Sequence, residues 1–376
     1  MIASRRTFLT GLAALPAALA LPRLAQAQDM TARAGAALDA AFVGGPPAMA
    51  AAVVGPRGLI WSGVRGVPPP RAGGGEPATL DQRWHLGSNG KAMTAVLYGR
   101  LVEQGRARWG ATLQTLFPDA AIDPALAPVT IDDLLCHRSG LLDRDILSRE
   151  VLMAGHQDQR PARDQRSDFA AIVLGKPPTG PRGTFAYGNV NFVLAGAAIE
   201  RLTGQPWEEV IAAELFTPLG MTSVGHGAPQ GENPWGHRMM GDQFAAVDPA
   251  RGADNPAFMG PAGRMHMTVA DYARFLSLYL SGGGGAVRPE TLAHLLTPPQ
   301  GPPPTYAYGW GLQTGQAWAA GGPALAHEGS NTMWHAIARV APQRGLAVLS
   351  LANERTRGAP ANQALAQALI DIRAPV

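Results

Sequence analysis

The sequence of 376 residues is 46% apolar, which is enough to bury the core of one large domain or two closely packed lobes. Its formal charge of +3 includes three arginines, Arg5, Arg6 and Arg23, in an N-terminal segment that has no acidic side chain. Without these three, the 31 basic side chains become 28, which equals the 28 acidic ones and gives no electrostatic reason to expect a nucleic-acid partner. The single cysteine, Cys136, excludes a disulfide within the chain.

The N-terminus has the features of an export signal. Residues 4–9 read Ser-Arg-Arg-Thr-Phe-Leu, a twin-arginine pattern, and an apolar run follows as far as Leu21. The run has about 14 residues, whereas a membrane-spanning helix needs about 20, and no later stretch is apolar enough to span a bilayer. Small residues for cleavage follow at positions 25–27. We therefore predict a removed signal over residues 1–27, a mature chain that begins at Gln28, and a periplasmic or secreted protein without a stable membrane span.

The predicted elements of the mature chain change from strands to helices and back to strands. In chain order the clearest are a helix at 32–42, strands at 48–54 and 59–64, a helix at 88–103, strands at 334–340 and 346–351, and a helix at 361–372. Between them the chain is mostly helical with long connections. Two helix starts there have the pattern of a capping box, Thr130-x-x-Asp133 and Thr268-x-x-Asp271.

Strands at both ends of the chain predict an α/β fold with one antiparallel sheet that both ends complete. Helices from the N- and C-terminal segments would flank this sheet. We expect a single domain over residues 28–376. Its α/β part would comprise about 28–105 and 305–376, and its mostly helical part about 106–304.

The segment Ser88-Asn-Gly-Lys91 opens a predicted helix directly after a strand-like stretch. A spacing of three residues places the Ser88 hydroxyl and the Lys91 amine on one helix face. The positive end of the helix dipole would favour a developing alkoxide, and burial would lower the pKa of the lysine into the range of a general base. The pattern alone is weak, because Ser88 could equally cap the helix and Lys91 lie on the surface.

The lysine content of the chain strengthens the catalytic interpretation. Of the 31 basic residues only two, Lys91 and Lys176, are lysines. Arginine keeps its charge but cannot be deprotonated in a protein. A lysine retained one turn after a helix-opening serine is therefore expected to serve through its titratable amine.

Seven segments, in this order, resemble the serine β-lactamase and penicillin-binding protein family. The resemblance is to the branch of class C β-lactamases, D-alanyl-D-alanine carboxypeptidases and esterases, and it covers most of the mature chain. The segments that carry it are His85-Leu-Gly-Ser-Asn-Gly-Lys-Ala-Met-Thr94, Ile131-Asp-Asp-Leu-Leu-Cys-His-Arg-Ser-Gly-Leu141, Gly183-Thr-Phe-Ala-Tyr-Gly-Asn189, residues 194–204, residues 216–221, Tyr308-Gly-Trp-Gly311 and His327-Glu-Gly329.

The resemblance implies roles for two residues of a Tyr-x-Asn motif. Tyr187 would pass the proton of the nucleophile to the leaving group. Asn189 would form hydrogen bonds with the substrate and with Lys91. The Tyr-Gly-Asn sequence is also typical of an ordinary polar turn, so these roles depend on the family context.

The His327-Glu328-Gly329 segment stands where the family has Lys-Thr-Gly. By the resemblance, Gly329 would let this strand approach the acyl group, and the backbone N–H groups of Ser330 and Ser88 would form the oxyanion hole. A zinc site at His327 is not expected, because Asn stands at position 331 where the zincin motif requires a second histidine. The family reaction needs neither a metal nor an organic cofactor.

The family motifs leave the substrate open among small esters, amides and peptides. Glu328 would stand near a substrate carboxylate and repel it, provided that its side chain faces the cleft and not the opposite side of the strand. On this basis an esterase or amidase is the first hypothesis, a D-amino-acid peptidase or D,D-carboxypeptidase the second, and a β-lactamase the third. A penicillin-receptor-like module that binds without catalysis is the alternative outside the enzymes.

Overall fold

The computed structural model describes residues 20–67, 76–301 and 305–374. Its largest element is a seven-stranded antiparallel sheet in the order β2-β1-β12-β11-β10-β9-β8. The strands are β1 (Ala48–Gly55), β2 (Gly58–Gly66), β8 (Tyr306–Ala307), β9 (Trp310–Gln313), β10 (Ala324–Ser330), β11 (His335–Ala341) and β12 (Leu346–Ala352). The prediction of an α/β fold, with a sheet completed by both ends of the chain, is confirmed.

The central strands are buried on both faces because their side chains alternate between two apolar clusters. In β1, Ala50 and Ala52 pack into the cluster that continues into the helical region. Met49 and Val53 point to the opposite face, where they pack into a second cluster with the terminal helices. Every residue of β1 is buried, and this explains the continuous apolar run in the sequence.

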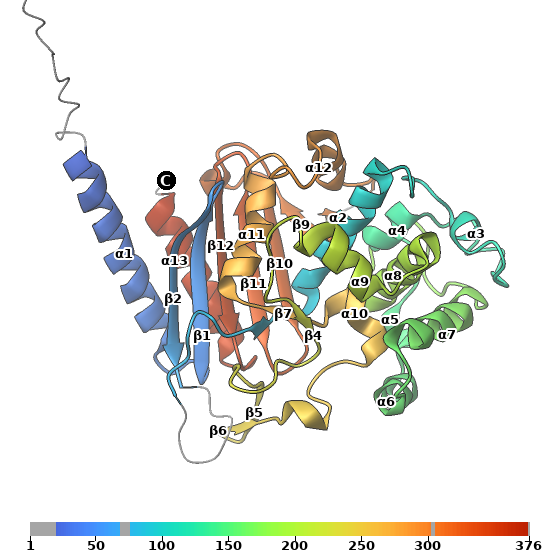
Figure 1. The fold of residues 1–376 in the computed structure, drawn as a ribbon, viewed down its shortest axis with the longest axis horizontal. Helices are drawn as coiled ribbons and strands as arrows, with labels where there is room; N and C mark the ends of the chain where they lie inside the picture. Colours follow the sequence, from blue (N-terminus) through green and yellow to red (C-terminus); the bar gives the residue numbers. More distant parts are fainter. Residues whose placement is uncertain (1–19, 68–75, 302–304, 375–376) are drawn as a thin grey trace, which may run out of the picture.

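Helices cover both faces of the sheet (Figure 1). The terminal helices α1 (Ala20–Phe42) and α13 (Gly358–Arg373) contact each other, and α13 packs on β11 and β12. On the other face α11 (Val269–Leu280) contacts β1 and β12. Helix α1 begins earlier than the predicted residue 32 and continues through the expected cleavage point before Gln28. Arg5, Arg6 and most of the apolar run lie outside the described residues.

The helical region lies to one side of the sheet, on the right in Figure 1. Its helices are α2 (Gly90–Glu103), α3 (Leu113–Leu116), α4 (Ile131–Leu135), α5 (Asp143–Ile146), α6 (Arg149–Gln157), α7 (Ala162–Leu174), α8 (Asn189–Thr203), α9 (Trp207–Ile211), α10 (Gly260–Gly263) and α12 (Pro289–Leu295). Short strands form two smaller sheets, β3 (Trp84–His85) with β7 (Met265–Met267) and β4 (Gly225–His226), and β5 (His237–Met240) with β6 (Gln243–Ala246). Among the residues that the structure describes, no helix is long and apolar enough to cross a membrane.

The two predicted capping boxes differ. The Thr130 hydroxyl accepts from the backbone of Asp133, whose carboxylate accepts from the Thr130 N–H, so this box is complete. Thr268 caps α11 in the same way, but the Asp271 carboxylate accepts from the Ser223 N–H and hydroxyl instead. The second box is therefore only half formed, because a partner distant in the sequence occupies the carboxylate.

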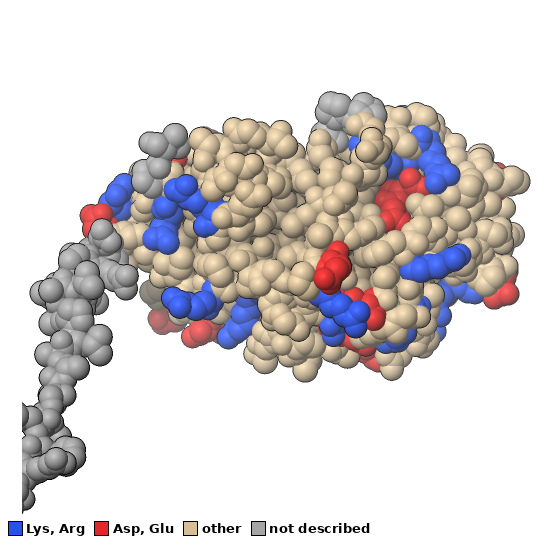
Figure 2. Space-filling model, turned by 90° about the horizontal axis from the view of Figure 1, so that it is seen from above, with Lys and Arg blue, Asp and Glu red and all other residues tan. Residues whose placement is uncertain are grey.

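Charged side chains are interspersed over the face of the molecule that Figure 2 shows. Basic and acidic groups both occur there, with wide areas of uncharged residues between them. This distribution agrees with the equal numbers of basic and acidic side chains in the sequence after residue 27.

Candidate active site

Ser88 lies where the small sheet leads into the helical region. Strand β3 ends at His85, and a 3₁₀ turn, η2 (Gly87–Asn89), then leads directly into α2. The prediction that Ser88 lies in the first turn of the α-helix is therefore wrong. Ser88 lies in the 3₁₀ turn that precedes this helix. Gly87 has φ +52°, a conformation that a residue with a side chain rarely adopts. Ser88 itself is half-buried, so a substrate can reach its hydroxyl.

Lys91 contacts Ser88 as the sequence spacing predicts. Its Nζ atom lies 2.9 Å from Ser88 Oγ, 2.8 Å from Asn189 Oδ1 and 2.6 Å from the carbonyl oxygen of Ala262. The side chain is completely buried, and this burial lowers the pKa of Lys91 to about 7 although the negative charge of Asp143 opposes the shift. A neutral amine has two N–H groups for Asn189 and Ala262 and one lone pair for the Ser88 proton. This geometry would suit a general base beside a nucleophile.

Tyr187 lies beside this pair on the open side of the site. Its ring centroid is 4.9 Å from Lys91 Nζ, and its phenol lies close enough to Ser88 for the serine hydroxyl to affect the phenol pKa. The residue is 42% exposed, but burial around the phenol raises its pKa, and the nearby Ser88 hydroxyl only partly offsets this rise. The phenol therefore remains protonated near neutral pH and can donate to a leaving group.

Asn189 is held by Asp143, a residue that sequence reasoning missed. The Asp143 carboxylate accepts from the Asn189 N–H at 2.7 Å, from its Nδ2 at 2.9 Å and from the Val190 N–H at 2.9 Å. These bonds satisfy backbone donors at the start of α8, where Gly188 has no side chain to cap the helix. Asp143 thereby turns the Asn189 oxygen toward Lys91. Nothing in the local sequence distinguishes Asp143 from the other acidic residues.

His137 also packs against Tyr187. Its ring lies 4.4 Å from that of Tyr187, and its Nδ1 accepts from the Gly188 N–H at 3.3 Å. Burial and the nearby Lys91 and His327 hold its pKa well below the ordinary value, so the ring is neutral.

The end of β10 lies directly against the turn that carries Ser88. A Cβ atom added to Gly329 would stand 2.0 Å from the Leu86 carbonyl oxygen and 2.8 Å from the Ser88 nitrogen. One added to Gly87 would stand 2.4 Å from the Ser330 nitrogen. Only glycine at positions 87 and 329 permits this approach, which lays the backbones of Ser88 and Ser330 against each other. The arrangement suits the pair of oxyanion donors that the sequence predicts.

His327 lies next to the nucleophile turn. Its Nδ1 is 3.2 Å from Asn89 Oδ1 and 2.9 Å from the Glu328 carbonyl oxygen, and its Nε2 is 3.1 Å from the Tyr306 hydroxyl. Burial lowers the pKa of His327 to about 3, and the positive charge of Lys91 acts in the same direction. His327 is therefore a neutral hydrogen-bonding group and not a cation.

The expectation that Glu328 lines the substrate site is wrong. Its carboxylate lies 3.3 Å from His335 Nε2 and 3.8 Å from an Arg339 nitrogen, and it accepts a hydrogen bond from Gln363 of α13. Successive residues of a strand point to opposite faces, so Glu328 shares the α13 side with Ala324 while His327 points the other way. The charge repulsion proposed for this residue therefore does not act on a substrate.

Comparison with known proteins agrees with this geometry. The model of the family described as beta-lactamase matches residues 35–371. Penicillin-binding protein 4 of Amycolatopsis lactamdurans is 30% identical over 299 residues, which are 75% of this chain and 74% of that protein. The unguisins hydrolase ungD' of Aspergillus campestris is 26% identical, and the match covers 78% of this chain but only 56% of that longer protein.

Solved structures share the fold. A D-stereospecific amidohydrolase from Streptomyces superposes with a TM-score of 0.69 at 22% identity, over 91% of this chain and 98% of that one. The match of the family model over nearly the whole chain, together with the similarity to the penicillin-binding protein, shows that the protein belongs to the beta-lactamase family of serine hydrolases.

Proposed function

We propose that this protein hydrolyses a neutral ester or amide through an acyl-enzyme on Ser88. The Ser88 proton passes to Lys91 Nζ while Oγ attacks the substrate carbonyl carbon. The negative oxygen of the tetrahedral intermediate accepts from the N–H groups of Ser88 and Ser330. Tyr187 then donates a proton to the leaving group and regains one from Lys91. Water, activated by the same groups, releases the acyl group and regenerates Ser88.

The contact between Lys91 and Ser88 carries this proposal. A buried amine with a pKa of about 7, at 2.9 Å from the hydroxyl, has both the reach and the proton affinity of a general base. A penicillin-receptor-like module that only binds would not need a fully buried lysine whose amine is held by Asn189 and Ala262 beside Ser88. Burial of that lysine lowers the free energy of unfolding, and a catalytic role explains why the protein retains it.

The proposed substrate class follows from His327, since Glu328 no longer bears on it. A substrate carboxylate at the end of β10 would meet a neutral imidazole where the family motif has a lysine. Neutral esters and amides lose nothing by this replacement. We therefore rank an esterase or amidase first, a D-amino-acid peptidase or D,D-carboxypeptidase second, and a β-lactamase third. Nitrophenyl esters, D-amino-acid anilides and nitrocefin, offered to the purified protein, test this order directly.

Introducing a cation at position 327 should favour anionic substrates. A close charge pair at a partly exposed site contributes about 1–4 kcal/mol, so His327→Lys should raise the ratio of penicillin to neutral-ester acylation about tenfold or more. The rates of acylation of both substrates are measured on the same preparation. Glu328→Thr is the matched control, and because Glu328 faces α13 it should leave the ratio unchanged. An unaltered ratio in His327→Lys would remove the basis for preferring neutral substrates.

We also propose that the chain is exported through a twin-arginine signal and cleaved before Gln28. The proposal is supported by the Arg5-Arg6 pair, the short apolar run and the small residues at 25–27. N-terminal sequencing of the exported protein should give Gln28 as the first residue. Replacement of both arginines by lysine should block export, whereas an exported protein that still carries Met1 would contradict the proposal.

A further inference from the structure

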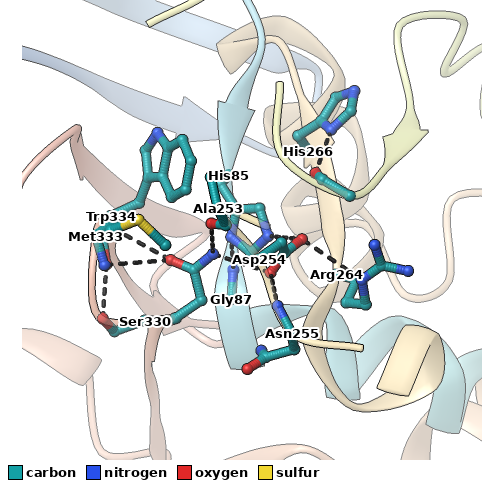
Figure 3. Close-up of polar contacts among 12 residues, drawn as sticks. His85, Gly87, Ala253, Asp254, Asn255, Arg264, His266, Ser330, Met333 and Trp334 are labelled. Atoms are coloured by element: carbon teal, nitrogen blue, oxygen red, sulfur yellow. Dashed lines mark hydrogen bonds and ion pairs between the residues drawn. The ribbon is translucent and has the colours of Figure 1, made fainter. Parts of the chain in front are cut away.

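The carboxylate of Asp254 is buried behind the nucleophile turn, outside the group of residues assigned above. It lies between the short turns η4 (Pro249–Arg251) and η5 (Ala257–Met259) and is only 8% exposed. Its Oδ2 is 2.8 Å from His85 Nε2 and 3.6 Å from Arg264 Nε (Figure 3). Its Oδ1 accepts from Asn331 Nδ2 at 2.9 Å. Burial alone would raise the pKa of Asp254, but His85, Arg264 and Asn331 together lower it, so the carboxylate is ionised.

One partner of Asp254 controls the turn just before Ser88. His85 Nδ1 accepts the backbone N–H of Gly87 at 3.1 Å, and the His85 ring is stacked on Trp334. Because Nδ1 must offer its lone pair to this N–H, the ring proton resides on Nε2, where it is donated to Asp254. The carboxylate thus selects the tautomer of His85 that can hold Gly87.

A second partner controls the chain just after Ser330. Asn331 donates through Nδ2 to Asp254, and its Oδ1 accepts from the backbone N–H groups of Met333 at 3.4 Å and Trp334 at 3.3 Å. Asp254, together with the Ala253 carbonyl oxygen at 3.3 Å from the same Nδ2, therefore fixes the direction of the Asn331 amide. That amide in turn holds the connection between β10 and β11.

The same carboxylate accordingly ties together the two segments that supply the oxyanion donors. We propose that Asp254 is a positioning residue that sets the His85 tautomer and keeps the Ser88 and Ser330 N–H groups at their working separation. It touches no reacting atom and acts only through His85 and Asn331. This inference rests on the proposed acyl-enzyme function.

Asp254→Asn is the most selective test, because it keeps the shape of the side chain. An amide cannot accept from both partners. If the new amide N–H at position 254 faces His85, the His85 ring must carry its proton on Nδ1. Nδ1 can then no longer accept from the Gly87 N–H. If the new N–H faces Asn331, the Asn331 amide must turn and abandon Met333 and Trp334. In either case we expect kcat for a nitrophenyl ester to fall on the order of 10²-fold with KM little changed, the pattern of a lost transition-state interaction.

Three further variants of the full chain separate positioning from plain stability. Asp248→Asn removes a partly exposed carboxylate from the same connection, where it accepts only from local partners, and should leave kcat unchanged. His85→Asn keeps an acceptor near Gly87 but loses the link to Asp254. His85→Gln keeps a donor for Asp254 but loses the acceptor for Gly87. Each variant should lower kcat. In the double variant, Asp254→Asn should lower kcat little beyond the loss caused by His85→Asn alone, because residue 85 then has no tautomers to select. Nitrogen NMR shifts of His85 should show Nε2–H in the unaltered protein and Nδ1–H, or a mixture, in Asp254→Asn.

Other outcomes have distinct meanings. Unchanged kcat and an unchanged His85 tautomer in Asp254→Asn would overturn the inference, as would a lower melting temperature with full activity of the folded protein. If Asp254→Asn does not fold, wild-type kcat in both His85 variants would overturn it. If the unaltered protein neither hydrolyses esters nor reacts with a fluorophosphonate, the proposed function fails, and the tautomer measurement still decides whether Asp254 controls His85.

Discussion

Replacing Ser88 by alanine should abolish covalent labelling by a fluorophosphonate and reduce ester hydrolysis by about 10³-fold or more, since no acyl-enzyme can then form. Intact-protein mass spectrometry provides the measurement, with one probe adduct on the unaltered chain and none on the variant. The fold should survive, because the small Ser88 side chain is half-buried and forms its hydrogen bond with Lys91 one turn away. Equal melting temperatures of the two proteins would show this.

Ser330→Ala is the matched control for this experiment. The Ser330 hydroxyl donates to the Trp334 carbonyl oxygen, whereas the role assigned to this residue belongs to its backbone N–H. The variant retains that N–H, so labelling should persist at a rate within about tenfold of the unaltered protein. A probe adduct that remains on Ser88→Ala would place the nucleophile elsewhere and contradict the assignment.

Patterns local in the sequence predicted most of the sheet. The hairpin of β1 and β2 follows from two apolar runs joined by Gly-Pro-Arg-Gly, and the structure pairs them antiparallel. The separation of Ser88 and Lys91 likewise follows from helical spacing. The scarcity of lysine was informative as well, because Lys91 is completely buried whereas the second lysine, Lys176, is exposed.

Interactions between distant segments could not be predicted in the same way. Alternation along β10 requires His327 and Glu328 to point to opposite faces, but it does not say which face meets the helices. The packing of α13 against β11 and β12 decides this, and it places Glu328 among His335, Arg339 and Gln363. Asp143 and Asp254 were missed for a related reason. Each acts on residues more than 40 positions away, and a single sequence contains no trace of such pairs.

Lys91→Met should lower the rate of Ser88 acylation by on the order of 10²–10⁴-fold, the usual contribution of a general base. Methionine has nearly the volume of lysine but no amine to accept the Ser88 proton. Lys91→Arg should be similarly impaired, because its guanidinium retains the charge but cannot be deprotonated. Stopped-flow acylation by a nitrophenyl ester gives the rate. Near-normal acylation in Lys91→Met would exclude the amine as the base.

The pH dependence of acylation should identify the same amine. The neutral form of Lys91 is the active one and its pKa is about 7, so the rate should rise with pH through this value and then become constant. The negative charge of Asp143 stabilises the ammonium form, so Asp143→Asn should shift the midpoint to lower pH, by up to about one unit. A midpoint that is unmoved by this change would mean that another group controls the profile.

The same shift of pKa has a consequence for stability with a definite sign. The pKa of Lys91 falls from its ordinary 10.5 in the unfolded chain to about 7 in the folded protein, so the unfolded state binds more protons between these values. The free energy of unfolding of the unaltered protein should therefore rise as pH increases from about 7 to about 10.5, and the full cost of burying the lysine is present below pH 7. Lys91→Met lacks this cost, because a thioether does not bind protons. Thermal unfolding at pH 6 should then show a higher melting temperature for the inactive variant than for the active protein, with a smaller difference at pH 10. Equal melting temperatures at both pH values would indicate that Lys91 is protonated in the folded state and is not the base.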